Sequence, residues 1–304
     1  MIKIDKKLLI DTLSKSQKDL FKDFMKLNPK HIDQVWDNKF IILKKDNKTK
    51  PLLCVHLDTI NTHSKCGDSN FDYTHIVDFQ EGLMLKPTTN LSCLGADDRA
   101  GVYIILKHYN QLIEKFHIGI FCDEEIGAKG SGSMTTLEHV SCFIGLDREG
   151  SKQVATYGYD NDELLSKFTN LGFAENMGSF TDASVLAQMF KKSCCNLSVG
   201  YYYQHTSDEF VLYDDISHTI ELLLNVDLVF DKEDYHIETT SYGYGYGYNY
   251  NSNSFFDDES IWGDSITKCY HCGAVVNDGV LSNELVWGHC PHCFTVLKED
   301  AEKL

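Results

Sequence analysis

Acidic motifs that directly follow apolar runs constrain this chain more than any other feature of its sequence. The motifs are His56-Leu57-Asp58, Asp123-Glu124-Glu125 and Asp147-Arg148-Glu149. The apolar runs before them, at 51–55, 117–122 and 140–146, have the length and composition of buried strands. Burying several carboxylates together without compensation would cost many kcal/mol, so side chains at these strand ends require a cation beside them.

Two further motifs extend this pattern. Gly95-Ala96-Asp97-Asp98 precedes the apolar run 102–106, at a loop or a helix start, and His205 follows a late apolar stretch. The candidate metal ligands are therefore His56, Asp97, Glu124, Glu125, Asp147 and His205. Imidazole and carboxylate groups are the ligands that zinc and similar divalent ions take. One such residue alone is ordinary in a protein, but a set of them at the ends of buried strands predicts a metal site.

The alternation of strands and helices predicts an α/β fold for residues 1–238. The predicted helices are 8–27, 99–116, 161–171, 182–191 and 216–230, and the predicted strands are 40–43, 51–55, 117–122, 140–146 and 197–203, with a hairpin at 73–79 and 83–85. We expect a three-layer sandwich around a mixed, mostly parallel sheet. In such sheets ligands bind beyond the carboxyl ends of the strands, where the candidate ligands lie.

The order of the motifs resembles the two-zinc exopeptidase superfamily, which includes peptidase T, the acetylornithine-deacetylase and carboxypeptidase line, and bacterial leucyl aminopeptidases. The resemblance covers roughly residues 8–230, and Gly95-Ala96-Asp97-Asp98 with Asp123-Glu124-Glu125 carries most of it. It implies two catalytic zinc ions, with Asp97 bridging both, His56 and Asp147 completing one site, and Glu125 and His205 completing the other. The matches of Asp147 and His205 are looser, and Asp160 or His218 could take their place.

The resemblance also implies a mechanism. Glu124 would be the general base that takes a proton from a zinc-activated water, and Asp58 would orient the His56 ring. The Asp97–Asp98 peptide bond would be cis. The segment 178–182 resembles a loop near the substrate in this family; alternatively, Asp182 is an ordinary helix N-cap.

The implied activity is hydrolysis of a peptide bond at a chain terminus. Residues 148–204 are too few to hold the separate lid domain of the peptidase T and carboxypeptidase lines, so we expect an aminopeptidase acting on short peptides. Two alternatives stay open. The chain could be a carboxypeptidase or a deacylase of an N-acyl amino acid or similar small amide, with the same site. It could also be a non-catalytic adaptor built on a peptidase fold.

A second metal-binding feature lies near the C-terminus. The composition changes after about residue 240, and we interpret the Tyr/Gly/Asn-rich stretch within 239–264 as a linker. Beyond it, residues 265–304 contain two Cys-x-x-Cys pairs, formed by Cys269, Cys272, Cys290 and Cys293. Four thiolates at this spacing predict a small zinc-ribbon appendage with one structural zinc.

The charge of the chain limits its partners. A formal net charge of -17 disfavours nucleic acid and anionic membranes, and no apolar run reaches the roughly 20 residues of a membrane span. The ribbon is acidic too, so a protein partner is the more plausible ligand for it. The scattered thiols fit a reducing compartment, and we expect a cytoplasmic protein.

Overall fold

The computed structural model describes residues 2–60, 76–79, 84–87, 93–158, 162–226, 228, 267–268 and 275–276. The chain divides into two units, residues 1–239 and 240–304, and each is treated by itself. The predicted linker and the four ribbon cysteines lie outside the described residues, as does Asp160. In the second unit, β13 (Thr267–Lys268) pairs antiparallel with β14 (Val275–Val276).

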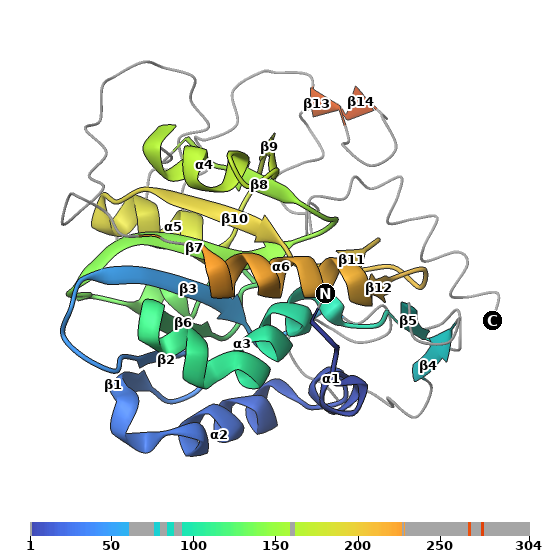
Figure 1. The fold of residues 1–304 in the computed structure, drawn as a ribbon, viewed down its shortest axis with the longest axis horizontal. Coiled ribbons are helices and arrows are strands. Elements are labelled where there is room, and N and C mark those ends of the chain that lie inside the picture. The colour runs from blue at the N-terminus through green and yellow to red at the C-terminus, as the bar shows by residue number, and fades with distance from the viewer. Residues whose placement is uncertain are drawn as a thin grey trace. The chain divides into compact units, whose positions relative to one another are not determined.

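The first unit is built on an eight-stranded sheet with the order β1-β2-β6-β3-β7-β10-β8-β9 (Figure 1). The strands are β1 (Ile32–Trp36), β2 (Phe40–Leu43), β3 (Lys50–His56), β6 (His117–Phe121), β7 (Val140–Arg148), β8 (Gln153–Thr156), β9 (Ala174–Met177) and β10 (Cys194–Ser198). The central strands β6, β3, β7 and β10 are mutually parallel, and β8 and β9 are parallel to each other. The pairs β1–β2, β2–β6 and β10–β8 are antiparallel, so the sheet is mixed and mostly parallel, as predicted.

Helices cover both faces of this sheet. They are α1 (Lys6–Leu13), α2 (Gln17–Leu27), α3 (Ala96–Lys115), α4 (Asp162–Thr169), α5 (Asp182–Phe190) and α6 (Tyr213–Asn225). Side chains alternate along β3: Leu53 and Val55 belong to the larger core with α1, α2, α3, α4 and α6, whereas Leu52 and Cys54 pack with α5. Burial on both faces explains why the central strands are continuous apolar runs, and it gives the three-layer α/β sandwich that the sequence predicts.

The single helix predicted over 8–27 is wrong, because the chain forms two helices there. Helix α1 ends at Leu13, and Ser16 begins α2 as its N-cap, with its side chain accepting a hydrogen bond from the Asp19 amide at 3.1 Å. Serine favours this position because its hydroxyl satisfies an amide that has no partner within the helix. The apolar spacing continues across the break, so periodicity alone did not show it.

The strand predicted over 197–203 is also divided, and the division places His205. Strand β10 ends at Ser198, and β11 (Tyr201–Tyr202) joins a second, four-stranded sheet of order β11-β12-β5-β4, with β12 at Phe210–Leu212. Gly200 stands between them with φ of +85°, and a Cβ there would lie 2.7 Å from the Ile216 amide nitrogen. Only glycine fits such a turn. The predicted hairpin is present, as β4 (Ile76–Phe79) paired antiparallel with β5 (Met84–Pro87).

No helix in the described part of the chain is both long and apolar enough to span a membrane.

The packing of α3 against β7 gives a test of the fold. A Cβ at Gly101 would lie 2.3 Å from the Leu146 carbonyl oxygen and 2.5 Å from Asp98 Oδ1, so Gly101→Ala forces helix and strand apart. We expect this variant to lose about 2 kcal/mol or more of the free energy of unfolding, measured by urea denaturation. Asn110→Ala, at an exposed position of the same helix, should stay within about 0.5 kcal/mol of wild type. Equal stability of the two variants would contradict this packing.

Candidate metal centre

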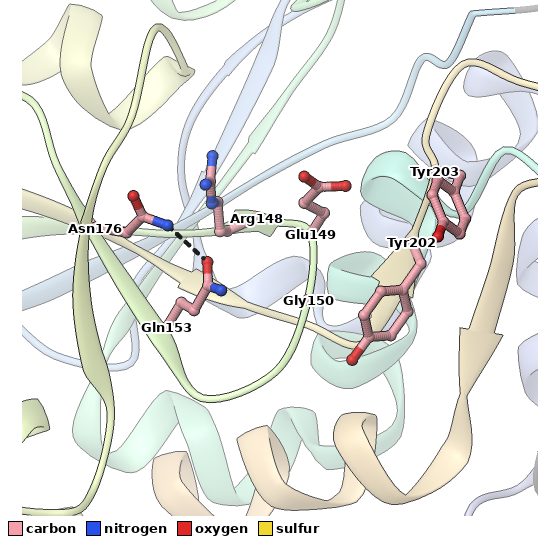
Figure 2. A pocket seen from close by; sticks show the side chains of 7 residues that line it. All are labelled: Arg148, Glu149, Gly150, Gln153, Asn176, Tyr202 and Tyr203. Atoms are coloured by element: carbon pink, nitrogen blue, oxygen red, sulfur yellow. Dashed lines mark hydrogen bonds between the residues drawn. The ribbon is translucent and has the colours of Figure 1, made fainter.

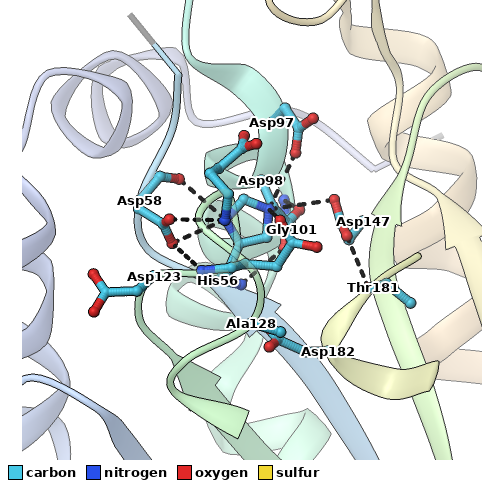
Figure 3. Close-up of polar contacts among 12 residues, drawn as sticks. His56, Asp58, Asp97, Asp98, Gly101, Asp123, Ala128, Asp147, Thr181 and Asp182 are labelled. Carbon is cyan, nitrogen blue, oxygen red and sulfur yellow. Dashed lines mark hydrogen bonds and ion pairs between the residues drawn. The ribbon is translucent and has the colours of Figure 1, made fainter. Parts of the chain in front are cut away.

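The carboxyl ends of three adjacent parallel strands bring the predicted ligands together (Figure 3). His56 is the last residue of β3, the Glu124–Glu125 pair follows β6, and Asp147 lies at the end of β7. Three sets of these groups place their ligand atoms within 4.8 Å of one another: His56 with Glu124 and Glu125, His56 with Asp98 and Asp147, and Asp97 with Glu125 and His205. All six candidate ligands are thus part of one cluster.

The loop before α3 gives its two aspartates different roles. The Asp97–Asp98 peptide bond is cis, as the resemblance implies, and both residues have non-helical backbone angles although they lie within the bounds of α3. Fully buried Asp98 accepts hydrogen bonds from the amides of His56 and Gly101, each at 3.2 Å. These bonds tie the loop to β3 and α3, and Asp97 is left facing the histidines.

Asp97 lies between the two histidines. Its Oδ1 is 3.1 Å from His56 Nε2, and its Oδ2 is 3.1 Å from His205 Nε2. Each histidine has a second carboxylate beside it: His56 Nε2 is 3.5 Å from Asp147 Oδ1, and His205 Nε2 is 2.9 Å from Glu125 Oε1. Two atoms bound to one tetrahedral zinc at about 2.1 Å lie about 3.4 Å apart, so both groups have the spacing of zinc ligands.

Asp58 connects His56 to the acidic pair after β6. Its carboxylate oxygens accept hydrogen bonds from the amides of Glu124 at 3.1 Å and Glu125 at 3.0 Å. The His56 Nδ1 atom lies 3.4 Å from Asp58 Oδ1 and 3.1 Å from the Asp58 carbonyl oxygen. An acceptor at Nδ1 leaves Nε2 free to bind a metal, so Asp58 is placed to orient the ring.

Glu209 is a residue of the centre that sequence reasoning missed. It is fully buried, and its carboxylate accepts hydrogen bonds from the amides of Gly95 at 2.6 Å, Ala96 at 2.9 Å and Asp97 at 3.2 Å. These three bonds fix the loop that carries Asp97. The only signal in the sequence is that Glu209 ends the polar segment following β11 that also holds His205, and such acids are usually exposed.

Asp147 is held by side chains from three other segments. Its Oδ2 accepts a hydrogen bond from the Thr181 hydroxyl at 2.9 Å, and its Oδ1 accepts one from the Tyr201 hydroxyl at 3.3 Å. Its backbone pairs with the Asn196 side chain. The segment 178–182 therefore borders the centre through Thr181. The alternative that Asp182 is the N-cap of α5 is wrong: Thr181 occupies that position, and Asp182 accepts a hydrogen bond from Ser131 at 2.5 Å.

Burial and mutual repulsion raise the pKa values of several of these acids, whereas hydrogen bonds to His205 and His56 lower the pKa of Asp97 despite its burial. Burial, with nearby Asp97, raises the pKa of Asp147 to about 6 and that of Glu209 to about 7, and burial raises the pKa of Glu124 well above its usual value. Burial opposes protonation of His205, yet the carboxylates of Asp97 and Glu125 raise its pKa well above the ordinary one. Without metal the cluster therefore holds protons tightly, and divalent cations would replace them. The residues present fit a dinuclear metal site.

His218 is not part of this cluster. It lies on α6, where its Nδ1 is 3.7 Å from Asp215 Oδ1, and none of the three ligand sets includes it.

Comparison with solved structures identifies the fold. A tripeptidase from Staphylococcus aureus subsp. aureus Mu50 superimposes with a TM-score of 0.54 at 12% identity, over 73% of this chain and 97% of that chain. Aminopeptidase PepT from Bacillus cereus gives 0.53 at 14% identity, over 72% and 96%, and the Pyrococcus horikoshii TET1 peptidase gives 0.51 at 14% identity, over 71% and 98%. No family model and no curated protein matches the sequence. The chain therefore has the fold of these peptidases.

The raised pKa values predict how metal removal changes stability. An acid or histidine whose pKa is higher in the folded than in the unfolded state stabilises the fold below that pKa and loses this effect as pH rises through it. Between pH 6.5 and 8.5 this stabilisation is lost at four groups. They are Glu209, Asp182 (whose pKa is raised by burial to about 8), His56 and His205. Burial lowers the pKa of His117 to about 4, so protonation of His117 changes the stability of the fold only below this pH range.

We therefore expect the melting temperature of the protein in chelator to fall between pH 6.5 and 8.5. Excess zinc should raise the melting temperature and reduce its dependence on pH, because the ions replace the protons. Differential scanning fluorimetry of the two samples across this range measures both effects. A melting temperature in chelator that stays constant or rises over the range would contradict the electrostatics of the cluster.

Proposed function

We propose that this protein is a zinc-dependent exopeptidase, and more specifically an aminopeptidase acting on short peptides. The observation that supports it most strongly is Asp97, whose two carboxylate oxygens each lie 3.1 Å from a different histidine. One carboxylate shared between two imidazoles has the arrangement of a ligand that bridges two metal ions. The fold, which the structures of aminopeptidases and a tripeptidase share, agrees with this reading.

The proposed ligands divide into two sets that share Asp97. His56 and Asp147 would complete one site, and Glu125 and His205 the other. Zinc supplies Lewis acidity, which polarises the carbonyl of the scissile amide and makes a water acidic near pH 7. Asp58 would hold the His56 ring in the orientation that leaves Nε2 for the metal, and Glu209 would hold the loop that carries Asp97.

Glu124 is the proposed general base. Its Oε2 lies 4.0 Å from His56 Nε2, a longer separation than those of the ligand carboxylates, so it can border the site without completing it. Burial raises its pKa well above the usual value of a glutamate, which makes its carboxylate a stronger base. It would take a proton from the attacking water and deliver it to the leaving amine.

The choice of aminopeptidase rests on the segment between Asp147 and His205. In the described part of this segment the chain forms β8, α4, β9, α5 and β10, which belong to the main sheet and its covering helices. No separate domain is formed there by the described residues. A carboxypeptidase or a deacylase of small amides would use the same centre, so assays with different substrates are needed to distinguish these activities.

Substitution of Glu124 tests its role as the base. Glu124→Gln removes the basic carboxylate and keeps the shape, so we expect metal content to stay at the wild-type level while kcat falls by about 100-fold or more. Elemental analysis and peptide hydrolysis assays measure the two quantities. Asp123→Asn is the matched control, because the Asp123 side chain points away from the cluster (Figure 3) and its Oδ2 is 3.3 Å from Lys39 Nζ. Wild-type turnover in Glu124→Gln would remove Glu124 from the mechanism.

Peptides blocked at one end test the class of substrate. We expect short peptides with a free amino terminus to be cleaved and their N-acetylated forms to be resistant. Elemental analysis should find about three zinc ions per chain, two in the centre and one at the four ribbon cysteines. Cleavage only of N-acylated substrates would favour the deacylase or carboxypeptidase. One zinc per chain without any hydrolysis would favour the adaptor.

A further inference from the structure

A pocket lined by residues close in sequence to two proposed ligands has no part in the mechanism described above (Figure 2). It has a volume of about 320 Å³ and is bounded by the end of β7 with the following turn, by β8 and β9, and by β11 with the residue after it. This volume suits a ligand the size of one or two amino-acid residues. We call it the Arg148 pocket.

The pocket contains an arginine whose side chain has no hydrogen bond or ion pair with any residue that the structure describes. Arg148 is partly buried, and its Nε atom is buried with no hydrogen-bond partner among the described residues, none of which forms an ion pair with it either. A guanidinium is always charged, so burying part of it without an anionic partner is costly, and an anion bound by its other N–H donors would compensate. The chain contains only two arginines, Arg99 and Arg148, and uses lysine for its other long basic side chains.

Two parts of the pocket wall are close in sequence to proposed metal ligands. Arg148 follows Asp147, a proposed ligand of one metal, and neighbouring Cα atoms are about 3.8 Å apart. Tyr203 comes two residues before His205, a proposed ligand of the other metal. A substrate with its scissile bond at the metals would therefore have a neighbouring group within reach of the pocket.

The remaining polar groups of the pocket favour an acceptor ligand. Asn176 Nδ2 donates a hydrogen bond to Gln153 Oε1 at 3.1 Å, which leaves the Gln153 Nε2 hydrogens available as donors (Figure 2). Gly150, with φ of +87°, forms the turn between them and Arg148, and a Cβ there would lie 3.6 Å from Gln153 Nε2. The one acid of the pocket is Glu149, which would disfavour an anion.

Tyrosines form the opposite wall. The Tyr202 ring stacks on Phe210 with centroids 5.1 Å apart, and its hydroxyl donates a hydrogen bond to Asp215 Oδ2 at 2.7 Å, so it is fixed. Tyr203 is 62% exposed. These rings provide an apolar surface for the carbon atoms of a ligand whose charged end lies at Arg148.

We propose that the Arg148 pocket is a carboxylate-binding subsite that selects the substrate of the metal centre. Arginine binds a carboxylate through two parallel N–H donors, and such charge-assisted bonds are strong and directional. The carboxylate could be the C-terminal group of a very short peptide or an acidic side chain next to the scissile bond. This inference rests on the proposed peptidase function for its substrate, and the experiment separates the two.

The experiment compares substrates that differ only in one carboxylate. For the zinc-loaded full-length protein, kcat/KM is measured for Ala-Ala-Ala against its C-terminal amide, and for C-amidated Glu-Ala-Ala and Ala-Glu-Ala against their glutamine analogues. We expect a preference of about tenfold or more for the carboxylate in at least one pair, and that pair identifies which carboxylate of the substrate binds.

Arg148→Gln should reduce the preference to within about twofold, and Arg148→Lys should retain part of it. Glu138→Gln, at an exposed position that does not line the pocket, is the control and should keep the preference at the wild-type level.

Two outcomes would overturn the subsite while the peptidase stands. The wild type could cleave both members of every pair equally, or Arg148→Gln could lower kcat/KM for both members by the same factor. If the wild type cleaves nothing, the proposed function fails. The subsite is then tested by calorimetry, which measures binding of the same peptide pairs to the zinc-loaded Glu124→Gln variant with and without Arg148→Gln. Carboxylate-dependent binding that Arg148→Gln abolishes supports the subsite, and equal binding of both members overturns it.

Discussion

The accumulation of acidic side chains at one edge of the main sheet is the constraint on which the rest of this structure depends. Seven buried acids gather there: Asp58, Asp97, Asp98, Glu124, Glu125, Asp182 and Glu209. Three are satisfied by the protein itself, since Asp58, Asp98 and Glu209 accept backbone N–H groups. Asp182 accepts the Ser131 hydroxyl at Oδ1, and its buried Oδ2 has no hydrogen-bond partner among the described residues. The remaining three, with Asp147, face two histidines. Their charges remain without sufficient protein cations, which is the condition under which bound metal stabilises a fold.

The fold determines which acids face the metals. Parallel strands β6, β3 and β7 end at the same edge, so three segments distant in sequence deliver their polar residues to one place. The acids bound to backbone amides hold the loops in position: Asp98 joins the loop before α3 to β3, Asp58 joins β3 to the turn after β6, and Glu209 joins the region of His205 back to the loop before α3. Each satisfied acid thus positions a ligand contributed by another segment.

Much of this centre could be predicted from the sequence, because its ligands directly follow apolar runs that can only be buried strands. His56, Glu124, Glu125 and Asp147 belong to this class, and the structure brings them together with Asp97 and His205. The supporting contacts could not be predicted in the same way. Glu209 reads as an exposed loop acid, and Thr181 and Tyr201 reach Asp147 only after the chain has folded. Local breaks, at Ser16 and Gly200, were missed because the apolar pattern continues across them.

The Arg148 pocket adds a cation next to this acidic edge. Two metals would carry the chemistry, and a fixed guanidinium would distinguish substrates, so that reaction and selection would depend on adjacent residues at the end of β7. Arg148 and Asp147 would then be coupled through one strand end, although only one of them would touch a metal.

The most direct test of the account is a crystal structure of the zinc-loaded protein with anomalous diffraction measured at the zinc edge. The account predicts two anomalous peaks about 3.5–4 Å apart, one on each side of Asp97, each close to one histidine. A single peak, or peaks that do not contact Asp97, would contradict a shared carboxylate as the basis of this site.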